Sequence, residues 1–358
     1  MKPFVIFGGA GFIGTNLAAR VASTGQKVRI VDNLSRQTSA LNAGWLRETF
    51  PDRVELVRGD VRDRDLVKAA VSDAVAVVHF AALVAVTTSM VDPRHDFDVN
   101  LLGTFNVLEA LRGRKVPLVF ASTNKVYGAL AGVPLQEGPG RWEPTAELLK
   151  RTGISEAAPL QFASPDGCSK GAADQYVLDH AECYGMPNVV LRMSCIYGPH
   201  QFGNEDQGWV SHFIIAALSG EPLTIYGDGK QLRDVLFVDD VVDAYLAAIT
   251  RSSSLAGRAF NVGGSPRHTL SLLELVEMLE IICDRELPVR FEPPRHGDQR
   301  FYVSDTRAFE AAASWRPKVS PAEGVRALAD WLSENHPRIA TKRRAPWPTQ
   351  SQPRWAPS

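Results

Sequence analysis

The most constraining feature of the sequence is a glycine-rich turn close to its start. Residues 4–7 (FVIF) are a short run of strand-forming residues, and GGAGFIG follows with glycines at positions 8, 11 and 14. Residues 15–23 then have the pattern of a helix. A turn without side chains lets the backbone approach a pyrophosphate, whose charge is met by the free N–H groups of the helix start. The stretch therefore predicts a dinucleotide site.

The next two expected strands end in acids that fit the adenosine half of such a ligand. Residues 27–31 lead to Asp32, whose carboxylate can accept both ribose hydroxyls. This acid favours NAD over NADP because it would repel a 2′-phosphate, although Arg36 nearby tempers the preference. After residues 54–57, Asp60 can accept from the adenine amino group while Val61 packs on the ring. The alternative role for these acids is to cap a helix, which is as plausible as ligand binding for Asp63 and less so for Asp60. The expected cofactor residues are Gly8, Gly11, Phe12, Ile13, Gly14, Asp32, Asn33, Arg36, Asp60, Val61, Ala81, Ala82, Asn100 and Lys170.

Composition limits the partners that the protein can have. The 358 residues include 45% hydrophobic residues, enough for a substantial core, and 39 basic against 40 acidic residues leave a net charge of −1. No global field would then attract nucleic acid or a membrane surface. The four cysteines lack the spacing of a zinc site or a disulfide framework, and no apolar run is long enough to span a membrane. We therefore expect a soluble, cytoplasmic protein that binds no metal.

Strand and helix patterns keep alternating along the chain. Further strands are expected at 74–80, 117–121 and 189–192, with helices at 65–71, 100–111 and 169–184, and a long active-site loop at 128–167. This order predicts an α/β fold with a Rossmann-type, doubly wound parallel sheet and a smaller α/β substrate-binding domain. We expect the NAD-binding domain to comprise residues 1–190 and 234–262, the substrate domain 191–233 and 263–335, and a disordered tail 336–358.

Residues with redox chemistry lie at the end of the fifth expected strand and in the helix that follows the loop. In NAD-dependent carbinol oxidation, a strand-end Ser or Thr is followed by a Tyr-x-x-x-Lys helix. The Tyr removes the hydroxyl proton, the Lys lowers the Tyr pKa and holds the nicotinamide ribose, and the Ser or Thr contacts the oxygen. Here Thr123 and Lys170 are present, but Asp166 occupies the position of the Tyr.

These motifs resemble those of the extended short-chain dehydrogenase/reductase family over about residues 1–335. The strings that carry the resemblance are GGAGFIG (8–14), VDN (31–33), GDVRD (59–63), VNLLGT (99–104), STNKVYG (122–128), RMSCIYGP (192–199) and GDGKQLRDVLFVDD (227–240). Among the family's nucleotide-sugar epimerases and dehydratases, STNKVYG, residues 165–181 and QFGNEDQGWV (201–210) are most similar to CDP-paratose (CDP-tyvelose) 2-epimerases.

The resemblance implies that NAD takes hydride from a sugar carbon, that the keto sugar rotates, and that hydride returns to the other face. Thr123 would orient the reacting oxygen, Arg233 would pair with the nucleotide phosphates, and Arg295 and Asp298 would hold phosphate and ribose. The expected substrate residues are Thr123, Asn124, Cys195, Gln201, Gln207, Trp209, Arg233, Arg295 and Asp298. Cys195 stands where the family has Asn.

The expected function is C2 epimerisation of a CDP-hexose by a homodimer that pairs through the helices 100–111 and 169–184. A 4-epimerase, a uronate decarboxylase, or a protein that binds NAD and a nucleotide sugar without turnover are the alternatives. Dehydration is disfavoured because Asn124 and Lys125 stand where a dehydratase needs Asp-Glu.

Three interpretations of Asp166 remain open. The carboxylate ends roughly 3 Å short of a Tyr hydroxyl, whereas proton transfer needs contact within about 3.2 Å or one bridging water. Asp166 could be a base that acts through water or a moved helix, kept ionised by Lys170. It could instead pair with Lys170 at i and i+4 while another group, with His200 the best option, moves the proton. In the third interpretation redox activity is lost.

Overall fold

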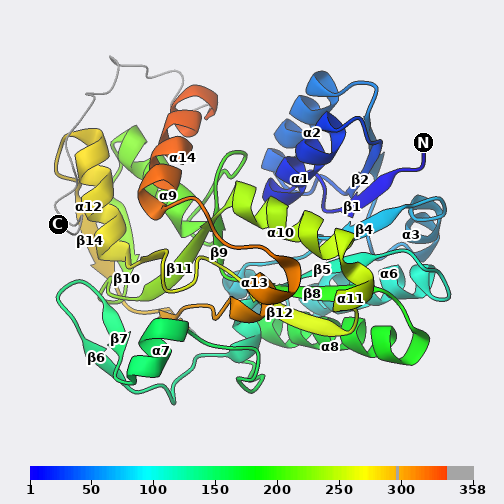
Figure 1. Cartoon of the computed structure of the whole chain (residues 1–358). Helices are drawn as coiled ribbons and strands as arrows, with labels where there is room; N and C mark the ends of the chain where they lie inside the picture. Colours follow the sequence, from blue (N-terminus) through cyan, green and yellow to red (C-terminus); the bar gives the residue numbers. More distant parts are fainter. Residues whose placement is uncertain (296–297, 337–358) are drawn as a thin grey trace.

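The computed structural model describes residues 1–295 and 298–336, so most of the predicted tail (337–358) lies outside the described residues. A seven-stranded parallel sheet in the order β12-β8-β5-β4-β1-β2-β3 forms the centre (Figure 1). Its strands are β1 (Phe4–Phe7), β2 (Val28–Asp32), β3 (Val54–Arg58), β4 (Ala76–His79), β5 (Leu118–Thr123), β8 (Asn188–Met193) and β12 (Arg258–Val262). The strand order reverses between β1 and β4, and ligands of open α/β sheets bind outside the strand ends at such a point.

Helices cover both faces of this sheet because strand residues alternate between two cores. In β1, Phe4 and Ile6 enter one core while Val5 and Phe7 enter the other. The first face packs against α1 (Phe12–Ser23), α2 (Gln37–Thr49) and α10 (Val238–Thr250), and the second against α3 (Arg64–Ala70), α6 (Gly103–Leu111) and α8 (Pro165–Tyr184). The doubly wound fold predicted from the sequence is confirmed.

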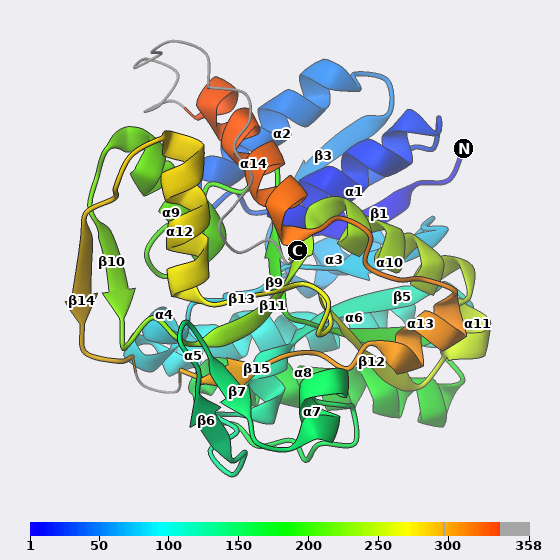
Figure 2. The ribbon, with the colours of Figure 1, turned by 60° about the vertical axis from the view of Figure 1, so that its left-hand side comes forward.

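A smaller α/β part adjoins the carboxyl ends of the strands. Its sheet joins β11 (Leu232–Phe237) to β9 (Cys195–Tyr197), β13 (Thr269–Leu270) and β15 (Phe301–Tyr302). Figure 2 shows the separate pair β10 (Leu223–Tyr226) and β14 (Val289–Glu292) beside α9 (Trp209–Ser219) and α12 (Leu272–Cys283). The remaining α-helices are α4 (Val86–Val91), α5 (Pro93–Phe97), α7 (Glu147–Thr152), α11 (Ser252–Leu255), α13 (Arg307–Ala313) and α14 (Pro321–Asn335). The exact division into two domains stays a prediction.

Two helices begin earlier than the sequence pattern indicated. α1 starts at Phe12 rather than at residue 15, because Gly11 already takes the extended N-cap conformation. α8 starts at Pro165 rather than at residue 169, because the Ser164 side chain accepts from the Gly167 N–H and proline occupies the first turn. Asp166 therefore lies in the first turn of α8, not in the loop before it.

One prediction of local structure is wrong and another is correct only in part. The expected loop 128–167 contains β6 (Leu135–Glu137), β7 (Trp142–Pro144) and α7 (Glu147–Thr152). The expected helix 100–111 is present, but its first three residues belong to a π-helical turn (Asp98–Leu102) that joins α5 to α6 and rotates the faces by one residue. Phe105 in α6 is 36% exposed. Other boundaries shift by a few residues. None of the described helices has the length and apolar character needed to cross a membrane.

Candidate functional site

One large pocket of about 530 Å³ opens along the carboxyl ends of the central strands. It runs from the glycine turn after β1 to the end of β5 and the start of α8, and on to the start of α9. The predicted residues that line it are Gly8, Gly11, Phe12, Ile13, Gly14, Asp32, Asn33, Arg36, Asp60, Val61, Ala81, Ala82, Thr123, Asp166, Lys170, Cys195, Gln201, Gln207 and Trp209. Asn100, Asn124, Arg233, Arg295 and Asp298 are not part of its lining.

The glycine turn packs too tightly for side chains. A Cβ at Gly8, whose φ is +73°, would lie 2.6 Å from the Ala81 nitrogen, and one at Gly14 would lie 2.4 Å from the Gly8 carbonyl oxygen. The first residues of α1 line the pocket, and their N–H groups have no side-chain cap from Gly11. A backbone cradle with free N–H groups at a helix start fits the pyrophosphate of the predicted dinucleotide.

The adenosine end is built around Asp32. Its carboxylate accepts from the backbone N–H groups of Ala10 (3.1 Å) and Leu34 (2.9 Å), and burial raises its pKa. Arg36 donates to the Gln207 amide oxygen at 2.7 Å, which joins the cofactor side of the pocket to the loop before α9. The carboxylate remains accessible in the pocket lining, as a ribose contact requires.

Asp60 is already engaged by protein groups. Arg62 donates to it at 2.9 Å and Asn33 at 3.1 Å, and the Arg62 hydrogen bond holds the pKa of Asp60 well below its usual range. The neighbouring Asp63 caps α3 by accepting from two backbone N–H groups, which settles the capping interpretation for that residue.

The other end of the pocket brings Thr123, Asp166 and Lys170 together. Asp166 is only 4% exposed, and no hydrogen bond or ion pair reaches its carboxylate within the described part of the chain. Burial raises its pKa to about 6, with Asp96 acting in the same direction and Lys170 and Lys125 opposing. A carboxylate with this pKa is mostly ionised at neutral pH and can accept a proton from a nearby donor.

Lys170 does not form an ion pair with Asp166, so the i, i+4 pairing proposed from the sequence is absent between these two described residues. Its ammonium donates to the Ala121 carbonyl oxygen at 2.5 Å and lies 4.3 Å from the Phe120 ring centroid. Burial lowers the pKa of Lys170 to about 8, against the opposing charges of Asp166, Asp174 and Asp96. Lys170 is therefore charged at neutral pH and acts on Asp166 through space.

Sequence reasoning missed the support behind this pair. Asp96, 1% exposed, accepts from the Ser169 hydroxyl at 2.5 Å and from the Asn100 amide at 3.0 Å. Asn100 also bonds both backbone groups of Leu83, so it holds the wall of the pocket rather than lining it. Only the position of Asp96 four residues before Asn100 on one helical face could have indicated this network.

The groups predicted to hold phosphate gather beside the pocket. Arg233 pairs with Asp298 at 2.7 Å, and Arg295 donates to the Glu205 carbonyl oxygen at 2.8 Å. Arg295 also lies 3.8 Å from the Tyr226 ring centroid. Asn124 is buried under the end of β5.

His200 is a packing residue. Its ring lies 4.2 Å from that of Trp45 and 5.0 Å from that of Trp331, and its Nδ1 contacts the Asn42 side chain. It does not line the pocket, and burial lowers its pKa to about 4. His200 is therefore not placed to serve as the alternative proton carrier.

Comparisons with known proteins agree with this geometry. Residues 4–263 match the model of the NAD dependent epimerase/dehydratase family. The CDP-paratose 2-epimerase of Salmonella typhi is 41% identical over 330 residues, which cover 90% of this chain and 96% of that protein. The Thermus thermophilus UDP-glucose 4-epimerase, solved with NAD, shares 32% identity at a TM-score of 0.77, covering 93% of this chain and 99% of that one. The Bacillus cereus UDP-glucuronic acid 4-epimerase, solved with UDP-glucuronic acid and NAD, gives a TM-score of 0.80 at 25% identity with the same coverage.

Proposed function

Because this chain belongs to the NAD dependent epimerase/dehydratase family and NAD is its cofactor, we propose that it is a nucleotide-sugar epimerase. The reaction that we propose is inversion at C2 of a CDP-hexose through a transient keto sugar. The supporting observation is a single pocket that joins the dinucleotide cradle to Thr123, Asp166 and Lys170, in a chain similar to a CDP-paratose 2-epimerase.

In the proposed mechanism, the glycine turn after β1 and Asp32 would hold NAD, which would supply the hydride acceptor and donor for the sugar carbon. Asp166 accepts the hydroxyl proton through a bridging water and gives it back, since its carboxylate has no protein partner among the described residues and a pKa of about 6. Thr123, at the end of β5, orients the reacting oxygen. The Lys170 charge, fixed on the Ala121 carbonyl, favours the ionised form of Asp166.

The test is to incubate the protein with CDP-paratose, CDP-tyvelose and UDP-sugars and to follow epimerisation. We expect interconversion of CDP-paratose and CDP-tyvelose. Tight binding of NAD and nucleotide without turnover of any sugar would replace this proposal with that of a binding protein. Turnover of UDP-sugars at C4 alone would replace it with that of a 4-epimerase.

Asp166 variants separate the roles left open by the sequence. Asp166→Asn keeps the shape and removes the base, so we expect activity to fall by about two to four orders of magnitude. Full activity of Asp166→Asn would exclude Asp166 as the base. A gain of activity in Asp166→Tyr would indicate a degraded form of the Tyr-x-x-x-Lys site.

We further propose a homodimer through α6 and α8. Phe105, Tyr176 and Tyr184 project from these helices and are 36%, 44% and 46% exposed. Phe105 and Tyr176 form an edge-to-face pair with ring centroids 5.6 Å apart. Aromatic side chains grouped in this way are typical of a protein interface.

A further inference from the structure

Lys125 is a charged residue of the pocket to which the mechanism above gives no role. It belongs to the short 3₁₀ turn Asn124–Tyr127 that follows β5, and its side chain lines the pocket. Its N–H donates to the Thr123 hydroxyl at 3.2 Å, and its carbonyl oxygen accepts from the Gly128 N–H at 3.1 Å. The same carbonyl oxygen lies 3.3 Å from the position of a Cβ at Gly167, in the first turn of α8. The backbone of Lys125 is thus fixed between β5 and α8.

The ammonium group of Lys125 has no hydrogen-bond or ion-pair partner among residues 1–295 and 298–336. Burial lowers its pKa, so the charge is held in a poorly solvated place. A desolvated charge without a partner is costly, and an ammonium can only donate hydrogen bonds. The geometry therefore calls for an acceptor oxygen on a ligand.

The charged neighbours of Lys125 indicate which part of a sugar nucleotide this oxygen belongs to. Arg233 acts on it from β11, Asp298 from the segment before β15, and Asp166 from α8. Lys125 is thus within electrostatic range of Arg233, which is expected to bind the phosphates, and of Asp166, the proposed base. In a nucleotide hexose, C2 is bonded to the anomeric carbon that carries the diphosphate, whereas C4 lies across the ring. Among the hydroxyl oxygens of the sugar, the one that can lie near both the base and the diphosphate is therefore O2.

We propose that the Lys125 ammonium binds the oxygen on C2 of the sugar and so directs the chemistry to that carbon. This inference rests on the proposed function and names the group that selects the reacting position. As Asp166 takes the hydroxyl proton and hydride leaves C2 for the nicotinamide, the C–O single bond becomes a carbonyl. Lys125 keeps its protons and donates a hydrogen bond to that oxygen throughout; when hydride returns to the opposite face, the proton returns from Asp166 to the oxygen.

A binding experiment tests the contact without requiring turnover. Calorimetry on the NAD-loaded protein would compare CDP-glucose with CDP-2-deoxyglucose, which lacks only the C2 hydroxyl. We expect the wild type to favour CDP-glucose roughly 10- to 100-fold, as for a hydrogen bond to a charged group, and Lys125→Met to remove this preference while CDP alone binds equally well. Lys125→Arg should restore part of it. No preference in the wild type, or an unchanged preference in Lys125→Met, would overturn the inference.

Kinetics then separates this inference from the proposed function. With CDP-paratose, Lys125→Met should lower kcat about 100-fold or more, as removal of a donor to a developing oxygen charge does elsewhere. If Lys125 held phosphate instead, KM and the affinity for CDP would worsen while kcat stayed constant, which contradicts the inference. Absence of wild-type epimerisation would refute the proposed function alone, because the calorimetric comparison still decides the Lys125 contact. Lys115→Met is the control, because Lys115 precedes β5 at the end of the strand opposite the pocket and donates to the Gly185 carbonyl oxygen.

Discussion

The carboxyl group of Asp166 and the ammonium group of Lys170 titrate on opposite sides of neutrality, because burial acts against both charges. It raises the pKa of Asp166 to about 6 and lowers that of Lys170 to about 8. The proposed base works only when deprotonated, so kcat/KM should fall as the pH drops below about 6. Because loss of the Lys170 charge removes support for the ionised base, kcat/KM should also fall above about 8.

This bell-shaped profile is measured as kcat/KM for CDP-paratose from about pH 5 to about pH 9. Asp166→Asn should lose the acid limb of the profile along with most of the rate. An acid limb that persists in Asp166→Asn would assign it to another group.

The glycine turn gives a second prediction. Gly14→Ala places a Cβ 2.4 Å from the Gly8 carbonyl oxygen, so the turn must move away from the pyrophosphate position. We expect NAD affinity to fall at least about 10-fold and stability to fall by about 1–3 kcal/mol. Gly44→Ala in α2 is the control, since nothing lies within 4 Å of its Cβ position. There the substitution should raise stability by roughly 0.5–1 kcal/mol. Fluorescence titration with NAD and thermal melting measure both effects, and equal NAD affinity in the two variants would contradict the argument.

Much of the site could be predicted from the sequence because its residues stand in local motifs. Gly8, Gly14 and Asp32 follow a strand-turn-helix-strand order that fixes their relative positions. Asp96 and Lys125 could not be found in this way. Asp96 matters only because α5 packs beside α8, and Lys125 matters because its ammonium is left without a partner among the described residues, which is a property of the folded chain.

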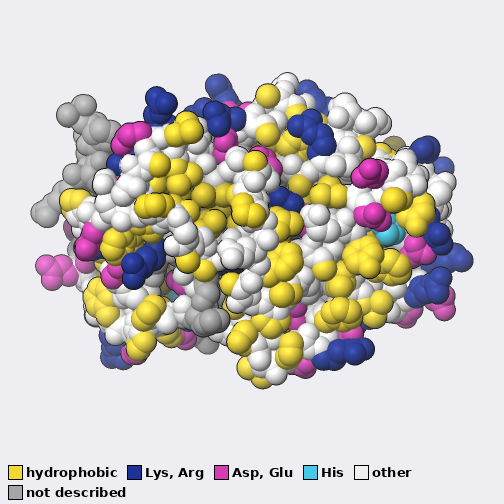
Figure 3. Space-filling model, turned by 90° about the horizontal axis from the view of Figure 1, so that it is seen from below, with side chains coloured by type: hydrophobic (Ala, Val, Ile, Leu, Met, Phe, Trp, Pro, Cys, Tyr) yellow, Lys and Arg dark blue, Asp and Glu magenta, His cyan; other side chains and the backbone are white. Residues whose placement is uncertain are grey.

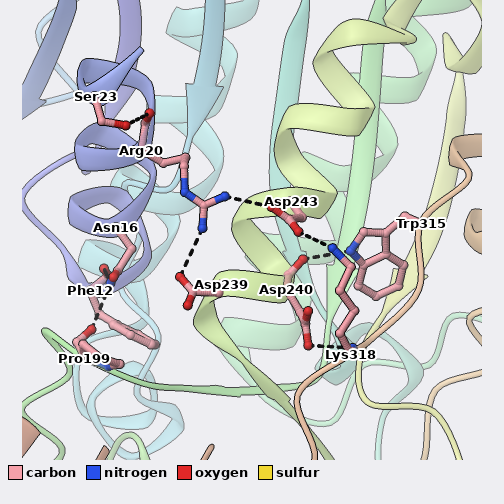
Figure 4. A network of polar contacts seen from close by, with 10 residues as sticks. All are labelled: Phe12, Asn16, Arg20, Ser23, Pro199, Asp239, Asp240, Asp243, Trp315 and Lys318. Carbon is pink, nitrogen blue, oxygen red and sulfur yellow. Dashed lines mark hydrogen bonds and ion pairs between the residues drawn. The ribbon is translucent and has the colours of Figure 1, made fainter. Parts of the chain in front are cut away.

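Polar contacts join α1, α10 and the segment before α14 on one face of the central sheet. Figure 4 shows Arg20 of α1 reaching Asp239 and Asp243 of α10, while Asp243 also binds Lys318 in the segment before α14. In the same network, the buried Asp240 carboxylate accepts from two backbone N–H groups, those of Lys318 and Val319, both at 2.9 Å. Asp240 thereby fixes the entry of the chain into α14.

Asp240→Ala should destabilise the protein by about 2–4 kcal/mol, because two partly buried N–H groups lose their acceptor. Asp239→Ala is the matched control, since its side chain is 58% exposed and makes one contact of 3.3 Å with Arg20. We expect it to change stability by less than about 1 kcal/mol. Urea denaturation measures both values, and a comparable loss in the two variants would show that the buried acceptor is unimportant.

The agreement and the differences between the predicted and observed strands and helices have clear physical causes. Strands of the parallel sheet were found because they are buried on both faces and read as apolar runs. The start of α8 was missed because Ser164 and Pro165, which cap it, resemble the end of a loop. The π-helical turn was missed because a 3.6-residue period assumes an uninterrupted helix.

The surface of the whole protein carries an apolar area that suits self-association. Figure 3 shows hydrophobic side chains gathered on the face seen from below, the side on which α8 lies in Figure 1. Phe105→Glu would place a charge amid Tyr176 and His180, whose rings it contacts. We expect this variant to be monomeric in analytical ultracentrifugation, where the wild type should sediment as a dimer.

Leu41→Glu is the control for this prediction, because Leu41 is also an exposed helical residue, at 49%, but lies on α2 across the sheet. It should leave the sedimentation unchanged. A wild type that sediments as a monomer would exclude the proposed dimer, and a dimeric Phe105→Glu variant would place its interface elsewhere.

The position of β12 has a consequence for how the protein is made. This last strand of the large sheet pairs with β8 from Arg258 to Val262, yet the chain forms β9, α9, β10, β11, α10 and α11 between the two. On the ribosome, β8 emerges long before its outer neighbour and for that time presents an open hydrogen-bonding edge. Nascent chains or proteolytic fragments that stop before residue 258 keep this edge open, so we expect them to aggregate or to be retained by chaperones.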